Sequence, residues 1–418
     1  MARKILKAKA KTSTTKNKET STKPAKVKRT KNKKLKSGDF PLVILTMGIL
    51  IFGIIMVFSA SYYTSINDAG NPYAYLIRDC AWACVGVVAM VFAATVDYHI
   101  YYKFAKPIMY ISVILLLLLL TPLGIERNYA VRWLGVGGIT IMPGELAKPA
   151  AIIFTSWFLS RNPKIIKSFT KGVLPLVVLC GVYAGLIIIQ PNLSTAITVC
   201  IIIVGIMFAA GLNYIYVGGV IGAGALGVVG LLVFFPDSHW MKRITSFMDP
   251  FADPLGTGYQ VVQSLLALGS GGLFGLGLGK SIQKNLYLPE PQNDFIFAII
   301  AEELGFVRCL ILMLAYMLLV WRAIHIALNA ADMFGTLMAS GVGIMIGIQV
   351  ILNIAVVTSS MPATGVTLPL VSYGGNSMVI FMGCIGILLN ISRHTYVDKE
   401  EIKRKAAERH KVNQRIKI

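Results

Sequence analysis

The stretch FPLVILTMGILIFGIIMVFSA, residues Phe40–Ala60, carries no charged side chain over its 21 positions. A helix of about 20 apolar residues spans the hydrocarbon core of a lipid bilayer. The stretch therefore predicts a transmembrane helix. Because 39 mostly polar residues precede it and no small-residue cleavage site follows a short apolar run, we do not expect a cleavable signal peptide.

Nine further apolar runs follow the first one along the chain. They are Leu76–Val96, Pro107–Leu123, Ala147–Leu159, Val173–Ile189, Thr195–Ala210, Tyr214–Phe235, Phe295–Trp321, Leu337–Val357 and Met378–Ile391. Of the 418 residues, 56% are apolar and only 14% are charged, which excludes both a soluble globular domain and a disordered chain. We expect an all-α integral membrane protein with about ten transmembrane helices.

The net charge of +21 is concentrated in two tails. Residues 1–38 contain 15 Lys or Arg and one acid, residues 393–418 contain nine and four, and the 354 residues between them contain 16 and 14. We predict a basic disordered cytoplasmic tail (1–38), a ten-helix membrane domain (39–392) and a second basic cytoplasmic tail (393–418). The N-terminal tail suits attraction to anionic lipid. It lacks the folded reader or interleaved aromatic residues that nucleic-acid binding requires.

The orientation follows from the short loops. An even number of spans puts both tails on one side, where the short loops carry seven Lys or Arg against three on the other side. The positive-inside rule places the tails in the cytoplasm. It places the long loop, residues 236–294, outside the cell.

A glycine-rich stretch, Gly269–Ser281, lies in this long loop. A phosphate-binding Walker loop would require glycine at the position of Phe274, so we exclude an ATPase. The stretch instead predicts a re-entrant hairpin shielded by protein. The six cysteines form no CxxC pair or Cys/His cluster and are interpreted as packing residues.

Acidic residues near the eighth apolar run are candidates for chemistry. Asp294 immediately precedes that run, and position alone favours a helix N-cap over a functional role. Glu302 and Glu303 lie about two turns deeper, where ionised carboxylates indicate a polar cavity. Arg308 needs a carboxylate partner, for which we expect Glu302, Glu303 or Glu145.

Basic residues provide candidate anion binders. Glu145 and Lys148 are spaced i, i+3 and predict either an ordinary helical ion pair or the wall of the cavity. On the outer face, Arg132, Arg243 and Lys280 lie among aromatic residues. They are either interfacial anchors or, grouped around a cavity, ligands for a diphosphate. These patterns leave open whether the protein moves a substrate or transforms it.

Several motifs together resemble the SEDS family of shape, elongation, division and sporulation proteins, which includes FtsW, RodA and SpoVE. The resemblance covers about residues 40–392. Its motifs include Arg132-Trp133-Leu134-Gly135, Met248–Gln260, Val262-Gln263-Ser264-Leu265, Asn293-Asp294-Phe295, Pro362–Pro369 and Ser372-Tyr373-Gly374-Gly375. The division–sporulation branch is the more similar one.

The resemblance implies a peptidoglycan glycosyltransferase that polymerises lipid II with a class B penicillin-binding protein as transpeptidase partner. It implies other divisome or sporulation partners and a place in the bacterial cytoplasmic membrane, at the division septum. The family's essential acid falls on Asp294, which reverses the positional preference for a cap. The residues that the resemblance and the charge pattern together assign to substrate binding are Arg132, Trp133, Glu145, Lys148, Arg243, Gln260, Ser264 and Lys280.

The implied reaction is inverting, with Asp294 as general base and cations on the departing diphosphate. It requires no ATP, and a divalent cation, Mg or Mn, could share the diphosphate charge, although no metal-ligand cluster demands one. The family usually has Asp where this chain has Asn192 and Ser where it has Gly144, so no charged role is carried onto Asn192. A lipid II flippase and a non-catalytic scaffold for a transpeptidase remain the alternatives.

Overall fold

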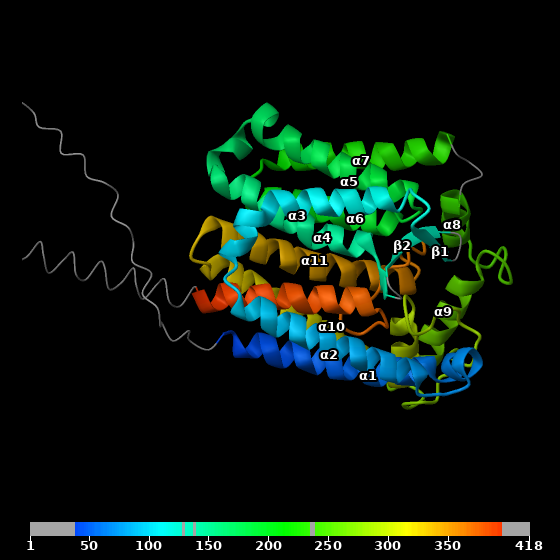
Figure 1. Ribbon diagram of the computed structural model, residues 1–418. Helices are drawn as coiled ribbons and strands as arrows, with labels where there is room; N and C mark the ends of the chain where they lie inside the picture. Colours follow the sequence, from blue (N-terminus) through cyan, green and yellow to red (C-terminus); the bar gives the residue numbers. More distant parts are fainter. Residues whose placement is uncertain (1–37, 128–129, 137–138, 235–238, 395–418) are drawn as a thin grey trace, which may run out of the picture. The chain divides into compact units, whose positions relative to one another are not determined.

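The computed structural model describes residues 38–127, 130–136, 139–234 and 239–394, and Figure 1 shows its elements. Helices form most of this part of the chain. In chain order they are α1 (Phe40–Ala69), α2 (Ala74–Thr95), α3 (His99–Leu118), α4 (Pro143–Arg161), α5 (Leu174–Ile189), α6 (Leu193–Ala209), α7 (Tyr214–Phe234), α8 (His239–Met248), α9 (Tyr259–Gly271), α10 (Ile296–Asn329), α11 (Met333–Val357) and a last helix, Gly375–His394. Most of both predicted tails, residues 1–37 and 395–418, lies outside the described residues.

Each of the ten predicted apolar runs coincides in large part with a helix. Seven of the described helices are long and apolar enough to cross a membrane: α1, α2, α3, α5 with the turn before it, α10, α11 and the last helix. The apolar helix α6 is shorter, at 17 residues. The multi-span helical architecture is confirmed, and the number ten stays a prediction.

The all-α expectation is wrong for the segment between α3 and α4. Strands β1 (Gly124–Arg127), β2 (Ala130–Val136) and β3 (Ile139–Ile141) form an antiparallel sheet in the order β1-β2-β3. These strands have three to seven residues. Strands this short do not form apolar runs of membrane-spanning length, so the pattern that predicts the helices does not indicate them.

Helix α1 shows how local sequence sets the helix ends. The Asp39 carboxylate accepts a hydrogen bond from the Leu42 N–H at 3.1 Å and caps the first turn. The helix then continues beyond the predicted end at Ala60 to Ala69. It stops at Gly70, whose φ of 64° is the left-handed conformation that glycine adopts without strain.

The core centres on α11 and the last helix. Helix α11 packs against α4, α6 and α10. In their most apolar windows, 61% of the residues of α11 and 67% of those of the last helix are buried, against 22% for α3. Helix α3 therefore lies at the periphery, where its apolar side chains are available to lipid.

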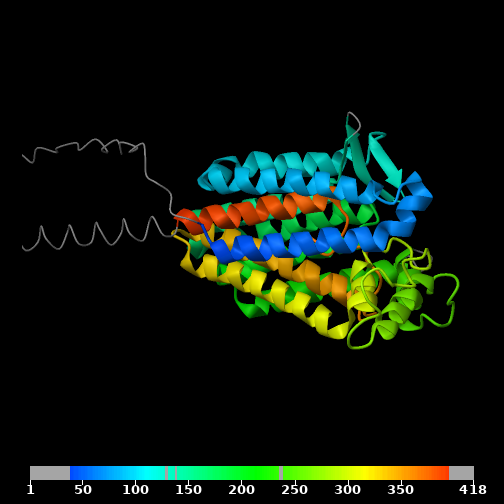
Figure 2. The ribbon, with the colours of Figure 1, turned by 90° about the horizontal axis from the view of Figure 1, so that it is seen from below.

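The beginning and end of the described body meet at one end of the helices. The Asp39 N–H donates to Ser392 Oγ at 3.1 Å, and the Asp39 carboxylate pairs with Arg322 of α10. The sheet, α8 and α9 lie at the opposite end (Figures 1 and 2). Both ends of the membrane body thus lie on the same side, as an even number of spans predicts.

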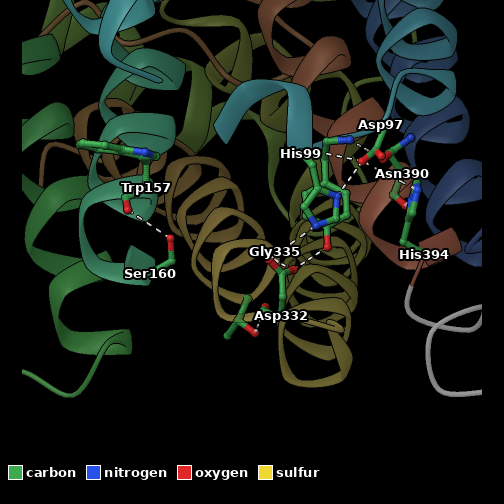
Figure 3. Close-up of polar contacts among 10 residues, drawn as sticks. Asp97, His99, Trp157, Ser160, Asp332, Gly335, Asn390 and His394 are labelled. Atoms are coloured by element: carbon green, nitrogen blue, oxygen red, sulfur yellow. Dashed lines mark hydrogen bonds and ion pairs between the residues drawn. The ribbon is translucent and has the colours of Figure 1, made fainter. Parts of the chain in front are cut away.

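Polar contacts also join the helices at this tail-side end (Figure 3). The Asp97 carboxylate lies 2.7 Å from His99 Nδ1, and the Tyr98 hydroxyl donates to Asp332 at 2.5 Å. Asn390 of the last helix accepts the Tyr98 N–H at 3.0 Å and donates to the Ala94 carbonyl at 2.9 Å. These bonds fasten the turn between α2 and α3 to the last helix and to the start of α11.

The glycine-rich segment after α9 folds back onto α10. Helix α10 is interrupted at Gly305, where φ is 78° and ψ is 175°. At this break the Leu276 N–H donates to the Glu302 carbonyl at 2.9 Å. A Cβ atom on Gly275 or Gly305 would lie 2.2 Å from the backbone of the other segment, so both positions require glycine.

Candidate active site

A cavity of about 590 Å³ lies between the sheet, the central helices and the segments that precede α10 and the last helix. Its lining combines residues from eight parts of the chain. They are Tyr75, Trp82, Arg132, Trp133, Thr140, Met142, Glu145, Lys148, Thr195, Thr198, Glu290, Asn293, Asp294, Gln349, Gly365, Val366, Thr367, Tyr373, Gly374, Gly375, Asn376 and Ser377. Five of the nine predicted site residues are among them.

Asp294 lines this cavity and does not cap α10. The helix begins at Ile296, its N-cap position is Phe295, and no side chain makes the capping hydrogen bond. The interpretation that position alone favours is therefore wrong. The backbone of Gly365 approaches so closely that a Cβ atom there would lie 3.3 Å from Asp294 Oδ2, and its φ of 73° also favours glycine.

The surroundings of Asp294 suit a group that exchanges a proton near neutral pH. Burial, and after it the nearby Glu290 carboxylate, raise the pKa of Asp294 to about 6. Arg132 and Arg243 oppose this rise because their positive charges stabilise the ionised carboxylate. A general base works best when its pKa lies near the working pH, so Asp294 fits that role.

Arg132 brings a positive charge to the same part of the cavity. It lies on β2, next to Trp133, and donates from Nη2 to the carbonyl of Pro191. Its buried Nε has no hydrogen-bond partner among the described residues. Leaving a buried N–H without a partner costs free energy of folding, so Arg132 is held in this place at some expense of stability.

Arg243 reaches the site from α8 but is not part of the cavity lining. Its Nη1 donates to the Ala363 carbonyl at 2.8 Å, in the loop that contains Gly365. Its charge acts on both Asp294 and Arg132, and burial lowers the pKa of each guanidinium. Because an arginine side chain stays protonated in proteins, the site holds two cations beside one carboxylate.

The α4 side of the cavity carries the predicted ion pair. Lys148 Nζ lies 2.6 Å from Glu145 Oε1 and donates to Gln349 Oε1 at 3.1 Å. Both charged residues are buried, with 2% and 6% of their surface exposed. The ion pair and the cavity wall, which the spacing left as alternatives, are both correct. Glu145 Oε2 is buried and has no hydrogen-bond partner in the described part of the chain.

Three predicted site residues do not reach the cavity in the described structure. Ser264 of α9 is fully buried and donates to the Val357 carbonyl of α11 at 2.8 Å, so it joins two helices. Gln260, on the same helix, is half-buried outside the lining. Lys280 is exposed in the glycine-rich segment.

The expectation that Glu302 and Glu303 face a polar cavity is wrong. Glu303 forms a buried ion pair with Lys284 at 2.9 Å and accepts a hydrogen bond from Ser59 of α1 at 2.7 Å. Glu302 accepts from Ser281 Oγ and from the Ile282 N–H. The two carboxylates instead hold the segment after the glycine-rich stretch against α10 and α1.

The expected carboxylate partner of Arg308 is also not found. Arg308 Nη1 donates to the carbonyls of Phe274 at 2.7 Å and Leu304 at 3.1 Å. These carbonyls lie beside the break at Gly305, where the helical hydrogen-bonding pattern of α10 is interrupted. An arginine can satisfy such acceptors as well as pair with an acid.

Several cavity residues were missed from the sequence. Gln349 is a polar amide inside the apolar run Leu337–Val357, and this signal could have identified it, since polar groups at membrane depth usually have a role. Tyr75 and Trp82 of α2 resemble ordinary interfacial aromatic residues, so no local signal distinguishes them. No group of three or more His, Cys, Asp or Glu in the described residues is arranged to hold a metal ion.

The comparisons with known proteins identify the family. A family model described as "Cell cycle protein", covering FtsW, RodA and SpoVE, matches residues 40–397. The chain belongs to the SEDS family. The resemblance found in the motifs is thereby confirmed, and the chain is a multi-pass membrane protein of this family.

Two SEDS relatives show the extent of the similarity. The chain is 43% identical to "Stage V sporulation protein E" of Bacillus subtilis (strain 168), over 86% of this chain and 98% of the relative. It is 36% identical to "Probable peptidoglycan glycosyltransferase FtsW" of Geobacter sp. (strain M18), over 84% and 96%. These matches support the division–sporulation branch of the SEDS family.

Solved structures agree in fold. One is described as "Structural coordination of polymerization and crosslinking by a peptidoglycan synthase complex". It matches with a TM-score of 0.71 and 28% identity over 86% of this chain and 98% of that chain. The rod shape determining protein RodA of Thermus thermophilus matches with a TM-score of 0.63 and 28% identity over the same shares.

Proposed function

We propose that this SEDS protein is a peptidoglycan glycosyltransferase that polymerises lipid II into glycan strands on the outer face of the cytoplasmic membrane. The observation that carries the proposal is that Asp294 lines a cavity and that the positive charges of Arg132 and Arg243 act on its carboxylate. The names of the FtsW relatives support the same activity.

The proposed chemistry uses these three residues in different roles. Asp294 takes the proton of the acceptor 4-hydroxyl, whose oxygen forms the new bond to the anomeric carbon of the donor. The bond between that carbon and the diphosphate breaks, and the carbon inverts. The positive charges of Arg132 and Arg243 stabilise the departing diphosphate, and the burial of both guanidinium groups strengthens their effect.

A divalent cation, Mg or Mn, is proposed only as a companion of the substrate diphosphate. The described residues provide no ligand set for a resident metal. We therefore derive no step through a metal. The chain's own cations, including Lys148 on the α4 side of the cavity, supply positive charge without one.

We propose a class B penicillin-binding protein as the transpeptidase partner, together with divisome or sporulation proteins at the septum. The relative named for stage V sporulation supports this setting. The structural neighbour described as a peptidoglycan synthase complex supports a partner that crosslinks what the SEDS protein polymerises.

Substitution of Asp294 tests the proposed activity. The purified full chain with its transpeptidase partner is expected to form glycan polymer from lipid II, and Asp294→Asn and Asp294→Ala are expected to lose at least about 100-fold in rate. Asp294→Asn removes a buried charge, so its melting temperature at pH 7 is expected to equal or exceed that of the wild type. Polymer formation by both variants at the wild-type rate would exclude the assigned base.

The same assay separates the alternatives. Movement of lipid II across proteoliposome membranes without polymer formation would favour a flippase. Polymer formation that persists with the transpeptidase partner but does not depend on any cavity residue would favour a scaffold.

A further inference from the structure

Asn353 of α11 is a buried amide that connects two segments of the cavity wall. Only 1% of its surface is exposed. Its Nδ2 donates to the carbonyl of Asp294 at 2.8 Å and to the carbonyl of Val366 at 2.7 Å. A side-chain amide has two N–H donors, and these two bonds use both.

The two carbonyl groups belong to the segments that meet at the Asp294 carboxylate. The first is the carbonyl of Asp294 itself. The second belongs to Val366, directly after Gly365, whose backbone lies against Asp294 Oδ2. One nitrogen atom on a rigid helix therefore sets the spacing between the carboxylate and the loop that faces it.

Two other bonds act on these segments. The Tyr373 N–H donates to the Gln292 carbonyl at 2.9 Å and joins the Asp294 segment to the end of the Gly365 loop, while Arg243 donates to the Ala363 carbonyl at 2.8 Å at the start of that loop. Asn353 differs because it binds the carbonyl of Asp294 itself and the residue next to Gly365, both from one helix. One turn earlier, Gln349 of α11 accepts from Lys148, so one face of α11 contacts both the Asp294 side and the α4 side of the cavity.

We propose that Asn353 is a positioning residue for Asp294. It fixes the backbone of Asp294 relative to the Gly365 loop and to the cations, while it contacts no substrate. This inference rests on the proposed function, in which Asp294 is the base. A displacement of about 1 Å in a reacting group can reduce turnover about 100-fold, so the effect falls on turnover rather than on substrate binding.

Asn390 provides a matched control. It also has 1% of its surface exposed, and it also bridges two backbone groups, accepting from Tyr98 and donating to Ala94. It lies at the tail-side end of the helices, among the contacts in Figure 3 and away from the cavity. Asn390→Leu therefore reproduces the structural cost of losing a buried bridging amide.

The experiment compares Asn353→Leu, Asn353→Asp and Asn390→Leu in the full-length protein. Polymerisation of lipid II gives kcat and KM, thermal unfolding gives stability, and hydrogen exchange reports on the backbone of residues 288–298. We expect kcat of both Asn353 variants to fall at least about 30-fold with KM changed less than about threefold. Asn353→Asp keeps the size of the side chain but places a carboxylate against two carbonyl oxygens. Its kcat should therefore fall at least as far as that of Asn353→Leu.

Asn390→Leu should lose a similar amount of thermal stability yet keep kcat per folded molecule within about twofold of the wild type. Exchange over residues 288–298 should speed up in the Asn353 variants only. Equal kcat for Asn353→Leu and Asn390→Leu, or unchanged exchange near Asp294, would overturn the positioning role. A wild-type protein without polymerase activity would instead remove the proposed function, and the exchange measurement would still decide whether Asn353 holds this segment.

Discussion

At the scale of single residues, the environment of Asp294 predicts a pH dependence. Burial and the Glu290 carboxylate raise its pKa to about 6, and the base must be ionised to accept a proton. Polymerisation should therefore rise with pH and reach half of its maximum near pH 6. Glu290→Gln keeps the oxygen that accepts from Asn293 and removes the like charge, so the pKa of Asp294 falls and the acid limb should move to lower pH.

The measurement is the initial rate of glycan formation from lipid II between pH 5 and pH 9, with a matched profile for Glu290→Gln. The plateau rate should stay within about twofold, because Gln keeps the hydrogen bond. An acid limb that stays in place or moves to higher pH would contradict the electrostatic role of Glu290.

At the same scale, local sequence suggested a helix cap for Asp294. Only the family motif pointed to a role in the cavity, since Arg132 and Arg243, whose charges act on the Asp294 carboxylate, come from distant parts of the chain.

At the scale of elements, the segment after the glycine-rich stretch is held by a buried ion pair. Lys284 Nζ lies 2.9 Å from Glu303 of α10 and 3.2 Å from Ser59 Oγ of α1. Breaking a buried pair leaves one charge without a partner and costs about 3–5 kcal/mol, whereas replacing both charges together is often neutral. We expect Lys284→Met to lower the melting temperature strongly and the double variant Lys284→Met/Glu303→Gln to recover much of the loss.

Thermal unfolding of the two single variants and the double variant in one detergent checks this coupling. A double variant that is no more stable than Lys284→Met would show that the pair does not hold the segment.

The sequence predicted this element only in part. The glycines predicted a re-entrant hairpin, but the ion pair was not predicted, because the partners of Lys284, Ser59 and Glu303, lie on two helices far from it in the sequence.

The helices and the sheet were predictable to different degrees for a physical reason. A membrane requires long uninterrupted apolar runs, so the positions of α1 and α11 follow from composition. The sheet between α3 and α4 has no such requirement. Its strands place Arg132 and Trp133 at the cavity through pairing with β1, where Ile125 lies opposite Trp133. Pairing between short strands produces only a weak pattern in a sequence that consists mainly of transmembrane segments.

At the scale of the whole molecule, the charge pattern and the structure together predict which end faces the cytoplasm. The sheet, α8 and α9 lie at one end of the helices (Figures 1 and 2), and Arg132 of this sheet lines the cavity with Asp294. Asp39, directly before α1, meets Ser392 of the last helix. The excess of Lys and Arg on the tail side indicates that this end of the protein faces the cytoplasm.

A pair of exposed alanines tests this orientation. Ala252 lies in the long loop between α8 and α9, and Ala331 lies in the turn between α10 and α11. In intact cells, a membrane-impermeant thiol reagent should label Ala252→Cys, while Ala331→Cys should react only after the membrane is made permeable. The unmodified chain, with its six free cysteines, provides the background signal. The opposite order of labelling would place the Asp294 cavity on the cytoplasmic side, where a polymerase of the outer glycan layer could not work. The orientation experiment is therefore also a test of the proposed function.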